Sequence, residues 1–186
     1  MCYVGVLLTA TLAFQWLEAK PEDVGMSSRK LERMCRALRE EAKLNALVVI
    51  RHDRIVYEWY GSNYGRHVHH HTASLAKALI GGVTLIMGLG DERLKLNDYV
   101  WKYVPQWRTH PLKSKITIFH LATHSSGLED STPRTRGTWK EQFWKYPHHY
   151  RIARDVAPVL FEPGTKFHYS NTGMAMLAYC IAGAYK

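Results

Sequence analysis

Residues 71–80 place a hydroxyl and an amine one helical turn apart at the start of an apolar helix. Side chains three residues apart lie on the same face of a helix, so the Lys77 ammonium can approach the Ser74 Oγ, stabilise a developing alkoxide and relay its proton. A serine in the first helical turn also lies near the positive end of the helix dipole, and its own N–H can hold an oxyanion. The spacing therefore indicates a nucleophile at Ser74.

A Ser-x-x-Lys spacing alone is a weak signal, and Ser27 and Lys30 repeat it at the start of a charged helix. A second motif, Tyr169-Ser170-Asn171, lies where an extended segment meets another apolar helix, and it favours the match at Ser74 over the match at Ser27. A tyrosine there can act as a base toward a serine when an ammonium lowers its pKa, and Asn171 can orient that ammonium or a substrate carbonyl. Taken alone, the stretch also fits a core tyrosine beside a helix-capping asparagine. The two motifs together, in this order, favour one catalytic site.

Composition fits one domain, with 186 residues and a hydrophobic content of 46%. The formal charge of +9 implies attraction to anionic partners such as nucleic acid, acidic lipid or a carboxylate-bearing polymer. Lysine and arginine are scattered along the chain without a nucleic-acid-binding signature, so we expect a solvated basic surface and no nucleic-acid partner. Cys2, Cys35 and Cys180 form no Cys-x-x-Cys pair and are expected to be free, partly buried thiols.

Residues 1–19 begin with an uncharged apolar run that is too short to span a bilayer. We interpret them as a signal peptide cleaved near Ala19, which predicts export to the periplasm or the extracellular space. The alternative is an ordinary apolar helix that is retained in the fold. Nothing later in the chain is typical of a transmembrane segment.

Hydrophobic periodicity predicts an amphipathic helix over residues 28–38, with Ser28 as its cap and an apolar face at Leu31, Met34 and Leu38. Two apolar runs around a polar turn predict a β-hairpin. Further helices are expected after Ser74, weakened at its glycines, after Thr117, and at the end of the chain. The polar, aromatic stretch between the last two is interpreted as a long surface loop. The predicted hairpin strands are residues 47–50 and 55–60. The later helices span residues 74–89, 118–124 and 171–185, and the loop spans residues 131–149.

Histidines and aromatic residues leave some alternatives open. The cluster His67, His69, His70 and His71 could bind a transition metal, but no carboxylate or cysteine stands at ligand spacing around it, so we interpret it as a solvated loop. His120 and His124 lack the zinc-binding His-Glu-x-x-His pattern and are assigned no chemistry. No metal and no cofactor are therefore expected. In the predicted loop, three aromatic residues could shape a substrate rim or cover core, namely Trp139, Trp144 and Tyr146.

The chain resembles the serine β-lactamase and D,D-peptidase superfamily, in particular the class C β-lactamase-like esterases and peptidases. The resemblance is carried by residues 21–27, 72–77, 120–128, 161–164 and 169–171, and by strands around Val48 and Val56. It implies an α+β, β-lactamase/transpeptidase-like fold, with a helical lobe, an antiparallel sheet flanked by helices, and the site between them. It also implies Ser74 as the acylated nucleophile, Lys77 as its proton partner, Tyr169 as general base, and Asn171 as positioner of substrate and lysine.

One departure from the family pattern matters for function. The family's third element, a Lys-Thr-Gly or His-x-Gly strand, should follow the Tyr-x-Asn helix, and this sequence contains no candidate for it. That strand supplies the second oxyanion donor and neighbours for the hairpin. We therefore expect residues 20–186 to be a partial domain, truncated after the Tyr-x-Asn helix. Two hypotheses follow: a serine hydrolase acting on a β-lactam, ester or D-amino-acid peptide, or a non-catalytic relative that binds cell-wall peptides without turnover. The oligomeric state is left open.

Overall fold

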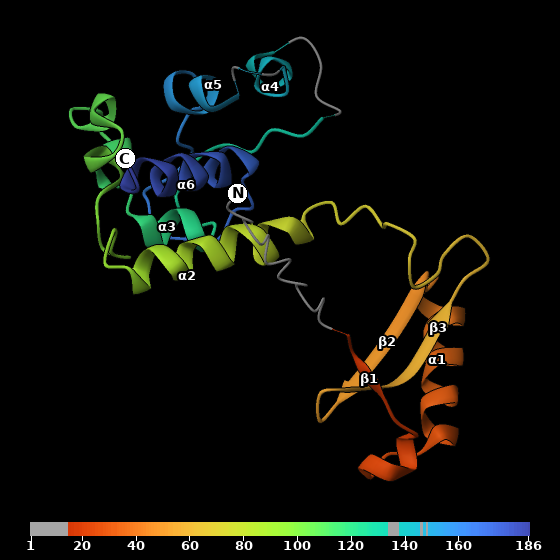
Figure 1. Ribbon diagram of the computed structural model, residues 1–186. Helices are drawn as coiled ribbons and strands as arrows, with labels where there is room; N and C mark the ends of the chain where they lie inside the picture. The colour runs from red at the N-terminus through yellow and green to blue at the C-terminus, as the bar shows by residue number, and fades with distance from the viewer. Residues whose placement is uncertain (1–14, 134–137, 146, 148) are drawn as a thin grey trace, which may run out of the picture. The chain divides into compact units, whose positions relative to one another are not determined.

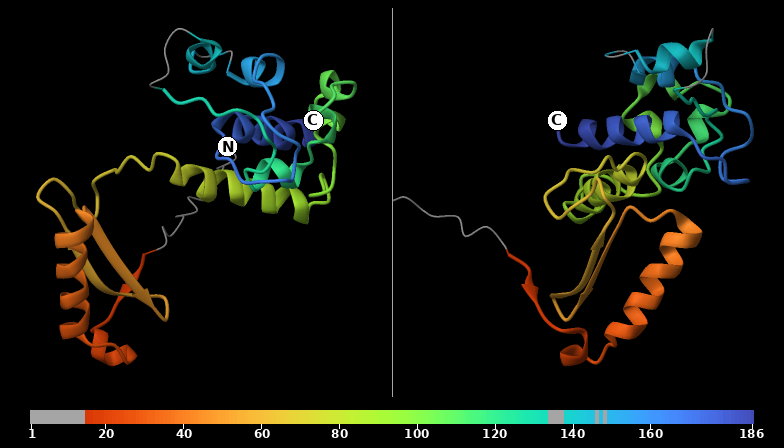
Figure 2. Two further views of the ribbon diagram at one scale, coloured as in Figure 1. Left: turned by 180° about the vertical axis from the view of Figure 1, so that it is seen from behind. Right: turned by 90° about the vertical axis from the view of Figure 1, so that its right-hand side faces the viewer.

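The computed structural model describes residues 15–133, 138–145, 147 and 149–186 (Figures 1 and 2). The chain divides into two compact units, an N-terminal unit of residues 1–71 and a C-terminal unit of residues 72–186. The boundary lies just before the Ser74 segment. Each unit has its own arrangement of helices, and the N-terminal unit holds the sheet.

The N-terminal unit is built on a β-hairpin, as predicted. Strand β2 (Ala46–Arg51) pairs antiparallel with β3 (Arg54–Tyr60). His52 and Asp53 form the turn with positive φ angles of 51° and 57°, which is the backbone a tight two-residue hairpin turn requires. A short strand, β1 (Leu17–Glu18), adds to the other edge of β3 in parallel, so the sheet has the order β1-β3-β2 and is mixed, where a purely antiparallel sheet was expected.

Helix α1 (Ser28–Ala42) follows the short 3₁₀ helix η1 (Pro21–Val24) and confirms the predicted amphipathic helix. Its cap differs from the prediction, because the side chain of Ser27 accepts a hydrogen bond from the Lys30 amide, whereas Ser28 bonds to Glu22. The buried face also shifts by one residue. Cys35 is buried one turn after Leu31, and Met34 is 40% exposed. The Arg39 guanidinium lies 4.7 Å from the centroid of the Trp59 ring on β3.

The predicted signal peptide falls largely on residues 1–14, which lie outside the described residues. Two of its remaining residues form β1, and the Ala19 amide donates to the Ile55 carbonyl at 3.1 Å. Arg66 forms ion pairs with both Glu18 and Glu58, which adds a second link between β1 and β3. Among the described residues, no helix combines the length and the apolar character needed to cross a membrane.

Helix α6 (Asn171–Ala184) is the centre of the C-terminal unit and confirms the prediction of a buried final helix. In Figures 1 and 2 it lies between α2 (Val83–Gly90) and α3 (Ile118–Ala122) on one side and α5 (His149–Asp155) on the other. Met176, Leu177 and Cys180 are at most 2% exposed. Burial raises the pKa of the Cys180 thiol to about 12, so this cysteine is a packing residue.

The predicted helix after Ser74 is present with one irregularity. It begins at residue 75, passes through a π-helical stretch, η2 (Lys77–Gly82), and continues as α2. Gly81 and Gly82 stand where the wider turn closes, consistent with the local weakening expected from these glycines. The π-helical turn starts at Lys77, so the irregular backbone lies under one of the predicted site residues.

Residues 94–116 form short helices and loops: η3 (Val100–Lys102), η4 (Pro105–Trp107) and η5 (Lys113–Lys115). Trp107 and Lys113 are nearly fully buried, and both donate to the Arg154 carbonyl at 2.8 Å. Burial lowers the pKa of Lys113 to about 8. These contacts fix the connection between η5 and the end of α5.

The long surface loop predicted for residues 131–149 is wrong in its described part. Helix α4 (Trp139–Phe143) begins after Thr138, whose side chain accepts from the Lys140 amide, and α5 begins at His149. Phe143 is only 4% exposed. A five-residue helix is too short to show a periodicity, which explains why the sequence pattern did not reveal it. Residues 134–137, 146 and 148 lie outside the described residues.

The packing of α3 gives a stability prediction with a matched control in the same helix. Leu121 is fully buried and Phe119 is 48% exposed. We expect Leu121→Ala to lower the free energy of unfolding by about 2–5 kcal/mol, because it leaves a cavity in the core. Phe119→Ala should lower it by less than about 1 kcal/mol. Urea unfolding followed by tryptophan fluorescence measures both values, and equal losses for the two variants would contradict this core assignment.

Candidate functional site

Ser74 follows a turn of unusual backbone geometry. Ala73 has a φ of 46°, a conformation that residues with a side chain rarely adopt, and the Lys77 amide donates to the Ser74 carbonyl at 3.0 Å as the helix begins. Strained backbone of this kind persists where surrounding structure holds it and is concentrated at functional sites. The turn leaves Ser74 exposed at the start of the helix.

Lys77 and Tyr169 converge on the Ser74 hydroxyl. The Lys77 Nζ donates to the Ser74 Oγ at 2.9 Å, and the Tyr169 hydroxyl donates to the same oxygen at 2.9 Å. Tyr169 lies 95 residues further along the chain. The structure therefore brings together three of the four predicted site residues, all within the C-terminal unit.

The electrostatic surroundings of Tyr169 favour its ionised form. Partial burial by itself would raise the pKa of this phenol, but hydrogen bonding with Lys77 and Ser74 and the positive charge of Lys77 outweigh burial and lower the pKa from its usual value near 10. The Lys77 Nζ lies 5.4 Å from the centroid of the Tyr169 ring. The geometry thus supplies the lowered phenol pKa that a tyrosine base requires.

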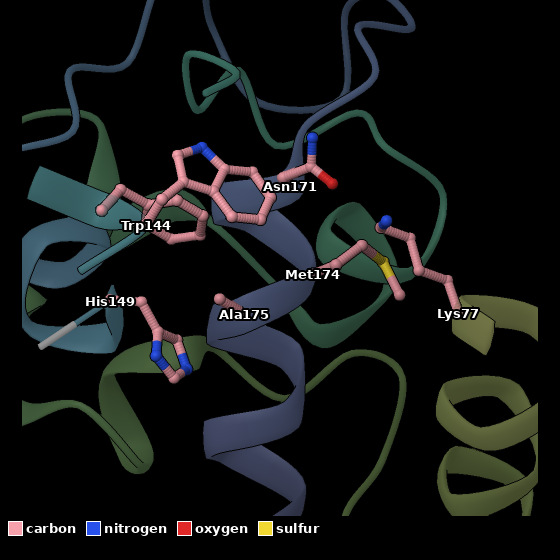
Figure 3. Close-up of a pocket in the computed structure, with 7 residues that line it drawn as sticks. Lys77, Trp144, His149, Asn171, Met174 and Ala175 are labelled. Carbon is pink, nitrogen blue, oxygen red and sulfur yellow. The ribbon is translucent and has the colours of Figure 1, made fainter. Parts of the chain in front are cut away.

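Asn171 is the fourth predicted residue, and its side chain is held by a carboxylate. Its backbone N–H and its Nδ2 both donate to Asp130 Oδ1, at 2.7 and 2.9 Å, and Nδ2 also donates to the Ser131 carbonyl at 3.1 Å. With the amide nitrogen bound on that side, the Asn171 oxygen points toward the side on which the Lys77 amine lies (Figure 3). Direct positioning of Lys77 by Asn171 stays a prediction.

His124 fixes the position of Tyr169. Its ring stacks on the Tyr169 ring with a centroid distance of 4.6 Å and an interplanar angle of 26°. Its Nδ1 accepts from the Ser170 amide at 3.1 Å, and its carbonyl accepts from the His168 amide at 2.8 Å. Burial and the charge of Lys77 lower the pKa of His124, although Asp130 opposes them, and this favours the neutral ring whose Nδ1 can accept a hydrogen bond.

Gly127 supplies the turn that aligns these contacts. Its φ is +78°, and a Cβ there would lie 2.5 Å from the Phe161 carbonyl oxygen, so only glycine fits. The Leu160 amide donates to the Gly127 carbonyl at 2.8 Å, beside the bridge between Leu128 and Val159. This turn directs the chain toward Asp130, which binds Asn171.

Three residues of this arrangement were missed by sequence reasoning. His124 was assigned no chemistry, and Asp130 and Ser131 were not singled out. Their partners lie about 40 residues or more away in the sequence, so no local spacing could reveal them. Of the three aromatic residues left undecided, Trp139 packs against the core, Trp144 is 43% exposed beside a pocket, and Tyr146 lies outside the described residues.

Within the described part of the chain, no group of three or more His, Cys, Asp or Glu side chains is placed to hold a metal ion. In the predicted histidine cluster, the His70 ring instead lies edge-on to Tyr64 with a centroid distance of 5.3 Å.

Comparison with known proteins identifies the family. The model of the Beta-lactamase family matches residues 31–186, which is most of the chain, and the chain therefore belongs to this family of serine hydrolases. The predicted family is thereby confirmed. A comparison with curated proteins found no match.

Solved structures confirm the β-lactamase/transpeptidase-like fold. A candidate beta-lactamase from Bacteroides dorei aligns with a TM-score of 0.66 and 21% identity over 86% of this chain and 47% of its own length. A penicillin-binding protein from Bacillus halodurans aligns with a TM-score of 0.55 and 24% identity over 81% of this chain and 49% of its own length. A beta-lactamase/D-alanine carboxypeptidase from Pseudomonas syringae aligns with a TM-score of 0.60 and 20% identity over 83% of this chain and 44% of its own length. The chain thus spans less than half the length of each of these structures.

The contact between Lys77 and Tyr169 gives a prediction about titration. Lys77→Met removes the hydrogen bond and the charge that lower the pKa of Tyr169, whereas partial burial remains, so we expect that pKa to rise. Carbon-13 NMR of the tyrosine ζ carbons measures it, with the Tyr169 signal assigned through Tyr169→Phe. Lys95→Met, on the loop after α2, is the control and should leave the Tyr169 titration unchanged. A Tyr169 pKa that stays the same without Lys77 would contradict the assignment.

Proposed function

We propose that this chain carries the nucleophilic part of an acyl-transfer site, in which Ser74 attacks an ester, lactam or peptide carbonyl and forms an acyl-enzyme that water hydrolyses. The observation that supports this most directly is the convergence of Lys77 and Tyr169 on the Ser74 Oγ, at 2.9 Å each. A nucleophile with a base and a cation within hydrogen-bond distance is the arrangement that activates a hydroxyl. Membership of the Beta-lactamase family supports the same reaction class.

The hydrogen bonds at Ser74 define how its proton can leave. A hydroxyl has two acceptor lone pairs and one proton, and here both partners donate to it. When Tyr169 is ionised, its bond to Ser74 reverses and the phenolate accepts the serine proton as the Oγ–C bond forms. The proton then passes from Tyr169 to the leaving alcohol or amine as the acyl C–O or C–N bond breaks. The Lys77 ammonium, which donates to the Ser74 Oγ, stabilises the phenolate and the developing alkoxide.

The backbone around Ser74 supports the oxyanion. The N–H of Ser74 lies before the first full helical turn, where amides have no acceptor within the helix, so it can donate to the carbonyl oxygen of the substrate. Asn171, held by Asp130, points its amide oxygen toward the side on which Lys77 lies (Figure 3) and can orient the ammonium or a substrate N–H. The activity of the chain by itself is part of the proposal, because it spans less than half of the solved relatives described above.

Intact-mass spectrometry after incubation with a fluorophosphonate or a penicillin tests acylation. We expect a stoichiometric mass increase in the wild-type chain and none in Ser74→Ala, because that variant lacks the attacking oxygen. Ser27→Ala is the matched control, since Ser27 stands in the other Ser-x-x-Lys spacing and caps α1. An adduct that survives Ser74→Ala would overturn the proposed site. A folded wild-type chain that binds penicillin without an adduct would favour binding without turnover.

The pH dependence of labelling tests the role of Tyr169. Only the phenolate accepts a proton, so the labelling rate should fall as the pH drops below the lowered pKa of Tyr169. Tyr169→Phe should reduce the rate by about 10²–10⁴-fold, the usual contribution of a positioned base. Labelling rates of both proteins are measured against pH. If Tyr169→Phe keeps the same rate and the same pH profile, Tyr169 is not the base.

A further inference from the structure

A pocket lies beside Lys77 and the start of α6. Its volume is about 380 Å³, and its lining includes Lys77, Asn171 and Met174 together with three rings from the α4–α5 region, Phe143, Trp144 and His149. In Figure 3, Lys77 lies on one side of α6, Trp144 and His149 lie on the other, and the Met174 side chain reaches toward Lys77. Lys77 lines the pocket and donates to the Ser74 Oγ, so the pocket adjoins the proposed site at this residue.

The aromatic wall of the pocket is fixed by the residue that also holds Asn171. The Trp144 indole N–H donates to the Ser131 Oγ at 3.0 Å, and that hydroxyl donates to the Lys140 carbonyl at 2.8 Å. The Ser131 carbonyl accepts from Asn171, and Ser131 itself is fully buried. Trp144 is thus 43% exposed and yet anchored. An exposed, anchored tryptophan beside a site is typical of a recognition surface.

The rings of the wall are arranged to receive another ring. Phe143 meets Trp144 edge to face at 5.1 Å and 90°, and it meets His149 at 6.1 Å and 83°. Met174 adds a polarisable thioether, which makes favourable contacts with aromatic rings. No carboxylate is among the described residues that line the pocket, and the Lys77 ammonium is, so the charge of the lining disfavours a cationic group. Its volume lies at the lower end of the ~300–1,000 Å³ typical of small-molecule sites.

We propose that this pocket binds the aromatic end of the acyl group of the substrate, which makes the preferred substrate class an aryl-acyl ester or amide. The placement of the scissile carbonyl at Ser74 rests on the proposed function. The affinity of the pocket for an aromatic group does not depend on it. Trp144 and Phe143 act as specificity-determining residues, since they contact the part of the substrate that does not react.

Binding of a stable analogue tests the pocket without any catalysis. The probes are phenylacetamide and acetamide, titrated into the Ser74→Ala protein labelled with nitrogen-15 at its tryptophan indoles. The Trp144 signal is assigned through Trp144→Phe. We expect phenylacetamide to shift this signal in a saturable manner and acetamide to leave it in place. No shift with phenylacetamide, or the same shift with both amides, would overturn the proposal whatever the fate of the acylation experiment.

A second experiment tests the pocket through acylation rates. The p-nitrophenyl esters of phenylacetic acid and acetic acid are compared by the release of nitrophenol and by the mass of the Ser74 adduct. The ratio of the two rates should exceed about 10 in the wild-type chain and fall about tenfold in Trp144→Ala, which loses the ring contact. Trp144→Phe should keep most of the preference, and Ala175→Phe, which fills the pocket, should abolish it. Phe119→Ala, an exposed ring elsewhere, should keep the wild-type ratio. A ratio insensitive to both Trp144→Ala and Ala175→Phe overturns the proposal.

Discussion

The proposed site depends on one shared acceptor, the Ser74 Oγ, on which an ammonium and a phenol converge. Lys77 reaches it by helical spacing alone, over three residues, so that contact is local. Tyr169 reaches it from 95 residues away, and only the tertiary structure can hold it there. The geometry of the site is therefore as stable as the packing that places Tyr169, and much of the C-terminal unit contributes to that packing.

Two neighbouring contacts carry this placement. His124 stacks on the ring of Tyr169 and accepts from the next amide in the chain, while Asp130 binds both the backbone and the side chain of Asn171. The segment between them is tied on both sides at the start of α6, whose first turn is capped by the buried Ser170. Because His124 must accept a hydrogen bond, burial and Lys77 favour the same neutral ring that this contact requires. The lowered pKa of His124 and its hydrogen bond from the Ser170 amide thus favour the same arrangement.

Local rules predicted much of the fold and of the site. The helical spacing of Ser74 and Lys77, the alternation in the hairpin and the apolar repeat of α6 each involve neighbours within about four residues, and all three elements are present. Contacts between distant segments, such as Trp144 with Ser131 or β1 with β3, have no such pattern, and neither does the left-handed Ala73. The shifted face of α1 shows the same limit, because Cys35 and Met34 fit an apolar repeat about equally well and only packing against the sheet selects Cys35.

The helix that follows Ser74 is packed on one side only within its own unit. Leu85 joins the core with α6, whereas Leu79, Ile80, Val83, Ile86 and Met87 are each more than 50% exposed. A contiguous apolar face of this kind is costly in water and typical of a surface that another part of a protein covers. The π-helical turn from Lys77 to Gly82 lies in the same helix and contacts α6, where Met174 lies against Gly81. The first two turns of α6 thus border both the turn that carries Lys77 and the aromatic pocket, and Tyr169 lies two residues before the helix begins.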